Sequence, residues 1–116
     1  MDRLKIVWED LVSRQRFQIG SLEKIDGEFR FTYYMPTLEQ AKEKGFKGLV
    51  GFPDFNVVYS NKDMFPIFEC RLPDKRRPDI KEILHKYAVE KFDAFELLKV
   101  TGGKLPTDTL EFYKED

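Results

Sequence analysis

The sequence has little of what builds a covalent or metal-bound site. Cys70 is the only cysteine and His85 the only histidine among the 116 residues. One cysteine cannot form a disulfide within the chain, which favours a reducing compartment. One histidine cannot supply a histidine-based metal site, and Cys70 has no partner at C-x-x-C spacing. The sequence therefore predicts neither an internal disulfide nor a bound metal.

An excess of one charge and long apolar runs are also missing. Twenty Lys and Arg stand against 21 Asp and Glu, for a formal net charge of -1. There is thus no overall basic field of the kind that indicates nucleic acid. No apolar run approaches the ~20 residues of a membrane-spanning helix, and the N-terminal MDRLKIVWED is too short and too charged for a signal peptide. We expect a cytoplasmic protein with no membrane partner.

What is present indicates a folded domain. Hydrophobic residues make up 41% of the chain and aromatic residues 15%, and a disordered chain would lack that aromatic content. A length of 116 residues suits one domain and is too short for two ordinary ones. We expect residues 1–116 to form a single domain.

Apolar and polar residues alternate along several segments, as they do in half-buried strands. Phe17 and Ile19, with Ser21 next in phase, share one predicted face, and Asp26-Gly27 is a strong hairpin turn. The predicted strands are 4–9, 16–22 and 28–34, a short strand near 57–59, and a last strand at 108–116.

Capping residues and helical periodicity predict four short helices. Thr37, Asp93, and either Ser60 or Asn61 are candidate N-caps, while Gly45 suits a helix end. The predicted helices are 38–45, 63–72, 79–89 and 94–102. The fold class is therefore α+β: a small, mainly antiparallel β-sheet, made of an N-terminal three-stranded meander plus a C-terminal strand, with three to four short helices packed on one side.

The stretch 100-VTGGKLPTDTLEF-112 is close to a phosphate-binding loop but has the wrong spacing. A P-loop needs G-x-x-x-x-G-K-[ST] between a strand and a helix. Here Leu105 follows Lys104, the first glycine is missing, and the segment follows a predicted helix. Gly102 or Gly103 instead predicts a helix end with positive φ. We therefore expect no nucleotide cofactor.

Nucleophilic catalysis has one candidate pair. Cys70 and His85 could meet in space, but Cys70 belongs to a predicted helix dense in Phe. Burial there would raise the pKa of the thiol and suppress its reactivity. We expect no catalytic residues, no cofactor and no enzymatic activity.

Two features are candidates for recognition of a partner. Lys75, Arg76 and Arg77 form a basic cluster in the proline-bracketed loop 73–79. Such a loop suits carboxylates or phosphates, and with nearby aromatic residues it suggests a nucleic-acid-binding or regulatory accessory module as an alternative function. A solvated connection, partly neutralised by its flanking aspartates, is the other interpretation.

The second feature is an aromatic run broken by Gly and Pro. It is either an exposed interface or a core assembled under a long loop. Its members are Phe46, Phe52, Phe55, Tyr59, Phe65 and Phe68.

The segments 63-DMFPIFECRLPD-74 and 93-DAFELLKVTGGKLPTDTLEF-112 resemble the N-terminal subdomain of HipA-type serine/threonine kinases, the toxins of HipBA toxin–antitoxin systems. The strand ending 19-IGSL-22 and the strand 29–33 also match that family. The family's S-L-P-L segment is replaced here by 51-GFPDF-55, and its glycine motif departs over 106–109. Phe65, Phe68, Leu72, Pro73 and Asp74 match the first motif, and Asp93, Phe95, Leu97, Leu98, Gly102 and Leu110 match the second.

The resemblance implies a binding module. Phosphoryl transfer needs a nucleotide-binding lobe, a catalytic Asp and a metal-binding Asp, and the matching family segment contains none of these. The chain is similar in size to HipS, the separate antitoxin of HipBST systems. The partners implied are a HipT-like serine/threonine kinase toxin and a HipB-like helix-turn-helix DNA-binding protein, with no direct nucleic acid. We expect the kinase contact to involve Phe52, Phe55, Met64, Phe65, Lys75, Arg76 and Arg77.

Overall fold

A single antiparallel sheet organises the computed structural model, which describes residues 2–105 and 109–115. Its strands within that range are β1 (Asp2–Glu9), β2 (Arg16–Ile25), β3 (Glu28–Tyr33), β4 (Tyr59–Asn61) and β5 (Leu110–Lys114). The order across the sheet is β4-β3-β2-β1-β5. The predicted meander and C-terminal strand are confirmed, whereas residues 108 and 116 of the predicted last strand lie outside the described residues. The short strand lies two residues later than expected.

A β-bulge in β2 overturns part of the predicted alternation. Ile6 pairs with Gly20 but Val7 pairs with Gln18, so Ile19 is the extra residue. Beyond the bulge the side chains change phase, and Leu22 is buried while Ser21 is half-buried. The expectation that Ser21 follows Ile19 on one face was therefore wrong. The Asp26-Gly27 turn was right: φ is 51° and 77° at these residues, as a type I′ hairpin requires.

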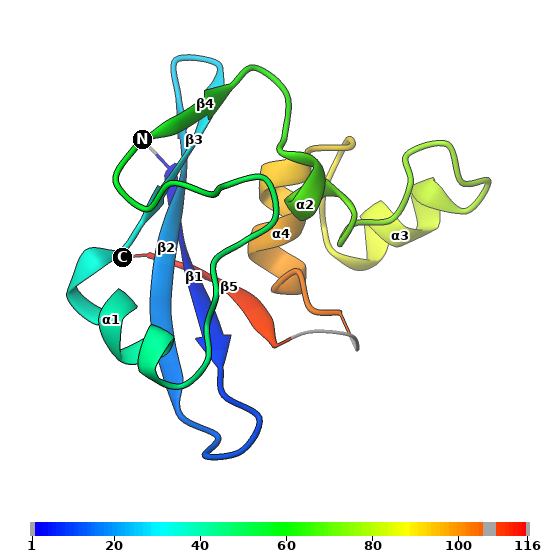
Figure 1. Cartoon of the computed structure of the whole chain (residues 1–116). Helices are drawn as coiled ribbons and strands as arrows, with labels where there is room; N and C mark the ends of the chain where they lie inside the picture. The colour runs from blue at the N-terminus through cyan, green and yellow to red at the C-terminus, as the bar shows by residue number, and fades with distance from the viewer. Residues whose placement is uncertain (1, 106–108, 116) are drawn as a thin grey trace.

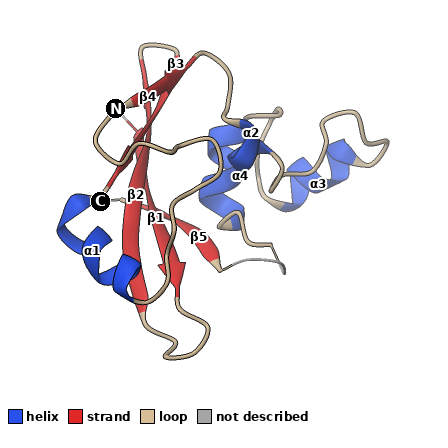
Figure 2. Ribbon diagram, in the orientation of Figure 1, coloured by secondary structure: helices blue, strands red, loops and turns tan. Residues whose placement is uncertain are grey.

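The described helices are α1 (Met35–Glu43), α2 (Pro66–Glu69), α3 (Ile80–Lys86) and α4 (Ala94–Thr101). Figure 2 shows α2, α3 and α4 on one side of the sheet, and the fold is α+β as predicted. At α4 both predicted caps are present: the Asp93 carboxylate accepts from the Glu96 N–H, and Gly102 has φ 78°.

The predicted end of α1 is also present: Gly45 follows the C-cap Lys44 and has φ 107°. The remaining predicted helix ends differ from the structure. Thr37 does not cap α1; its hydroxyl donates to the Gln18 carbonyl on β2. Ser60 and Asn61 pair with β3 in the sheet, so α2 begins only at Pro66. α3 ends at Lys86, and Ala88, with φ 59°, cannot continue it.

The core lies between one face of the sheet and the segments that cover it. Phe31 of β3 stacks on Phe52 at 4.4 Å between ring centroids, and Phe52 in turn meets Phe65 at 5.1 Å. Phe68 reaches Phe112 of β5 at 5.2 Å. Each buried Phe contributes about 1.5–3 kcal/mol by burial. The aromatic run is thus mostly core, and only Phe55 and Tyr59 are half-buried.

In the described residues, no helix is long and apolar enough to cross a membrane.

Candidate partner-binding surface

The seven residues expected to contact a partner divide into a buried and an exposed group. Phe52, Met64 and Phe65 are only 3%, 5% and 7% exposed. Phe55 is half-buried, and Lys75 to Arg77 are exposed. A partner that docks on the folded domain meets the second group directly, while the first group supports the surface from inside.

The exposed residues do not form one cluster. Phe55 packs against Tyr33 of β3 at 4.7 Å between centroids, and the Lys42 ammonium of α1 lies 3.9 Å from its ring. Lys75 to Arg77 lie in the loop before α3, and Figure 1 shows that loop and α3 projecting away from the sheet. The loop is therefore the more prominent of the two recognition elements.

Local ion pairs join neighbouring charges within this loop. The Arg76 Nε and Nη2 atoms donate to the two Asp74 carboxylate oxygens at 3.1 and 2.9 Å, and the Arg76 N–H donates to Asp74 Oδ1 at 2.8 Å. Arg77 makes an equivalent fork to Asp79, with both distances 2.9 Å. Hydrogen bonds from Arg76 lower the pKa of Asp74 to about 2, and those from Arg77 lower the pKa of Asp79. The flanking aspartates thus pair with the arginines, which weakens a sequence-independent grip on nucleic acid.

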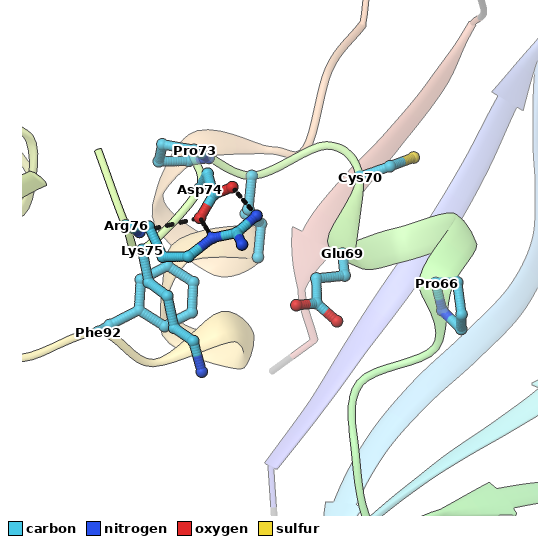
Figure 3. Close-up of a pocket in the computed structure, with 9 residues that line it drawn as sticks. Pro66, Glu69, Cys70, Pro73, Asp74, Lys75, Arg76 and Phe92 are labelled. Carbon is cyan, nitrogen blue, oxygen red and sulfur yellow. Dashed lines mark hydrogen bonds and ion pairs between the residues drawn. The ribbon is translucent and has the colours of Figure 1, made fainter.

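A hollow of about 510 Å³ lies beside the loop (Figure 3). Figure 3 shows the Asp74–Arg76 pair, joined by dashed lines, among the residues that line it. Its lining is mixed: Pro66, Glu69, Cys70, Leu72, Pro73, Asp74, Lys75, Arg76 and Phe92. The hollow offers both cations and apolar carbon to a partner side chain.

The supposed burial of Cys70 was wrong. The residue is exposed, and its Sγ donates to the Ile67 carbonyl at 3.2 Å. It follows α2, a helix too short to enclose it, whereas Phe68 of the same turn points into the core. Among the described residues, no group of three or more His, Cys, Asp and Glu side chains is placed to hold a metal ion.

Sequence reasoning missed three strongly exposed aliphatic side chains. Leu11 and Val12, in the connection between β1 and β2, are 68% and 93% exposed, and Val50 is 84% exposed. The signal that could have found them is their position: each lies in a short turn where polar residues are usual.

A family model described as the HipA N-terminal domain matches residues 11–107. No curated protein and no solved structure gives a match.

Proposed function

This chain belongs to the HipA N-terminal domain family, and from that premise we propose that it is an antitoxin that binds and inhibits a HipA/HipT-like serine/threonine kinase toxin. The observation that carries the proposal is the family match over residues 11–107. The matched family is the N-terminal domain and not the catalytic part of the kinase, so no enzymatic activity is indicated.

Inhibition by docking has a direct physical basis. Phosphoryl transfer depends on positioning the phosphates and metal between lobes that must close. A rigid domain bound beside the nucleotide lobe opposes that closure or covers the substrate path. In this proposal a HipB-like DNA-binding protein completes a three-part complex.

The loop from Lys75 to Arg77 is the proposed contact, with Phe55 as a second one. Its arginines are exposed and pair with Asp74 and Asp79, so their guanidinium groups are oriented before a partner binds. Phe65 contributes from inside, because it precedes α2 and packs on Phe52 and Phe68. Phe52 and Met64 belong to the same buried cluster.

Co-expression with the HipA-family kinase encoded beside the gene tests the proposal. We expect rescue of growth and copurification of the two proteins. Charge reversal at Lys75, Arg76 and Arg77 together should weaken both, whereas Lys114→Glu, an exposed change on β5, should not. If the wild-type chain neither rescues growth nor copurifies, the proposed function is wrong.

Phe65→Ala is an unsuitable probe of the contact alone. Truncating a buried Phe costs about 3–5 kcal/mol of stability, so loss of inhibition by this variant would report unfolding. Its thermal midpoint should be measured beside any binding result.

A further inference from the structure

An apolar groove lies next to the hollow of Figure 3. Its volume is about 480 Å³, within the range of ligand-binding pockets. Cys70, which follows α2, lines both the groove and the hollow. The apolar side chains of the groove include Trp8, Phe46, Leu49, Val50, Ile67 and Leu110.

The rim of the groove is held rigidly with an aliphatic side chain facing water. Val50 and Gly51 are the central residues of a turn closed by the Phe52 N–H donating to the Leu49 carbonyl at 3.1 Å, and Gly51 has φ 92°. The Tyr33 hydroxyl joins both ends of the turn: it accepts a hydrogen bond from the Leu49 N–H at 2.9 Å and donates one to the Phe52 carbonyl at 2.6 Å. Val50 is 84% exposed in this turn.

The β1–β2 hairpin adds apolar surface at the same end of the sheet. Trp8, which lines the groove, lies near the end of β1, next to this hairpin. Ser13 donates to the Asp10 carboxylate from both its N–H and its hydroxyl, at 3.0 and 2.6 Å. This frame displays Leu11 and Val12 to solvent. Leu11 and Val12 are 68% and 93% exposed and lie outside the groove lining.

The charges around the groove indicate the chemistry of its occupant. The exposed Lys47 lines it, and none of its described lining residues is acidic. Arg71 also belongs to the lining, but it is only 8% exposed and donates to the carbonyls of Ile67 and Gly103, at 3.3 and 3.1 Å. The charge available to a ligand is therefore that of Lys47. A complementary ligand combines apolar side chains with carboxylates.

We propose that the groove binds a segment of the partner kinase in which apolar side chains are flanked by Asp or Glu. This groove proposal rests on the proposed function. It assigns the largest part of the binding energy with the kinase to the groove. The paired loop from Lys75 to Arg77 then provides the polar rim of the same interface.

The chemistry of the groove can be tested without the kinase. The dye 8-anilinonaphthalene-1-sulfonate is apolar and anionic, and Trp8 is the only tryptophan of the chain. We expect saturable energy transfer from Trp8 to bound dye in the folded protein. Lys47→Glu and Val50→Asp should each weaken dye binding by at least about fivefold. The matched control is Val58→Asp, at a valine 59% exposed beside β4 and outside the groove lining, and it should bind as wild type.

A neutral analogue separates charge from apolar contact. N-phenyl-1-naphthylamine, which lacks the sulfonate, should be insensitive to Lys47→Glu but still weakened by Val50→Asp. Circular dichroism and thermal midpoints must show that all variants remain folded. Absence of saturable energy transfer, or equal dye binding by wild type and Val50→Asp, would overturn the proposal.

The kinase arm distinguishes this inference from the proposed function. With purified kinase, Val50→Asp should weaken binding at least about tenfold, or ~1.4 kcal/mol, and Val58→Asp should not. If the kinase binds wild type and Val50→Asp equally, the groove assignment fails and the antitoxin function stands. If the kinase does not bind wild type while the dye fills the groove, the function fails and the assigned occupant with it. A dimer in sedimentation equilibrium that Val50→Asp dissociates would replace the kinase segment by a second copy of the chain.

Discussion

The hydroxyl of Tyr33 shows how one residue fixes a whole loop. It bonds two backbone groups on either side of the Val50-Gly51 turn, and burial raises its pKa above the ordinary value. Both bonded groups are buried, so neither has water as an alternative partner. The loop across the sheet therefore depends on a side chain 16 to 19 residues earlier in the chain.

Tyr33→Phe should therefore destabilise the domain by about 1–3 kcal/mol, because it leaves a buried N–H and a buried carbonyl without their partner. Chemical denaturation followed by circular dichroism measures the change. Tyr34→Phe is the matched control: Tyr34 is exposed, and its change should be within about 0.5 kcal/mol. Equal stabilities of the two variants would show that Tyr33 does not hold the loop.

Asp74 gives a prediction of pH dependence. Its pKa falls from 3.8 to about 2, first because of the side-chain hydrogen bonds from Arg76 and then because of the Arg76 N–H. A lowered folded-state pKa stabilises the loop above pH ~3.8, and this contribution is lost as pH falls towards 2. NMR titration of the Asp74 carboxyl carbon should give a midpoint near 2.

Two arginine variants test the cause of the lowered Asp74 pKa. Arg76→Gln should move the Asp74 midpoint upward, though not fully, since the backbone N–H still donates. Arg77→Gln should leave it in place, because Arg77 pairs with Asp79. If the Asp74 midpoint were the same in Arg76→Gln as in wild type, Arg76 would not be the cause of the lowered pKa.

At the scale of elements, α4 depends on its N-cap. Asp93→Ala removes the bond to the Glu96 N–H, 3.1 Å long, and should cost about 0.5–2 kcal/mol. Asp93→Asn keeps a capping oxygen and loses only the charge and the 3.7 Å ion pair with Lys24. Thermal unfolding should therefore rank wild type and Asn close together and Ala lower. An Asn variant as unstable as Ala would mean that the charge and not the cap stabilises the helix.

Elements with local signals were predictable, and elements fixed by distant contacts were not. Asp26-Gly27 and the caps of α4 carry their structure in a few adjacent residues. Thr37 carries a capping signal too, but the Gln18 carbonyl on β2 takes its hydroxyl. The bulge at Ile19 is likewise set by the pairing of two strands, and the alternation alone does not place it.

The candidate site was less predictable than the fold. Hydrophobic periodicity does not show which side of an irregular loop faces the sheet. The sequence therefore did not distinguish the buried Phe52 and Phe65 from the half-buried Phe55 as partner contacts. The pairing of Arg76 with Asp74 and of Arg77 with Asp79 depends on the loop conformation, although the sequence showed the charges next to each other. Val50 was missed because an isolated valine carries no periodic signal.

Across the whole molecule, the helices differ in how many of their side chains pack into the core. One cluster of buried side chains joins β1, β2, β3 and β5 to α1, α2 and α4 through residues such as Leu38, Phe68 and Leu98. The buried residue of α3 is Leu84, which lies outside that cluster. Figure 1 shows α3 projecting from the body of the domain. The proposed contact loop is attached to this least integrated helix.

Hydrogen exchange should therefore separate α3 from the rest of the chain. Amides of α3 such as Ile83, and Tyr87 at its C-cap, should exchange by local opening, well below the free energy of global unfolding, because few apolar contacts oppose their release. Amides of β2 and of α4 should exchange only by global unfolding. Mass spectrometry on peptides covering 80–87 and 94–101 compares the exchange rates of α3 and α4, which are both short α-helices. If the proposed function holds, adding the kinase should slow exchange in 73–87 and leave 94–101 unchanged. Equal protection of the two helices in the free chain would contradict this division of the molecule.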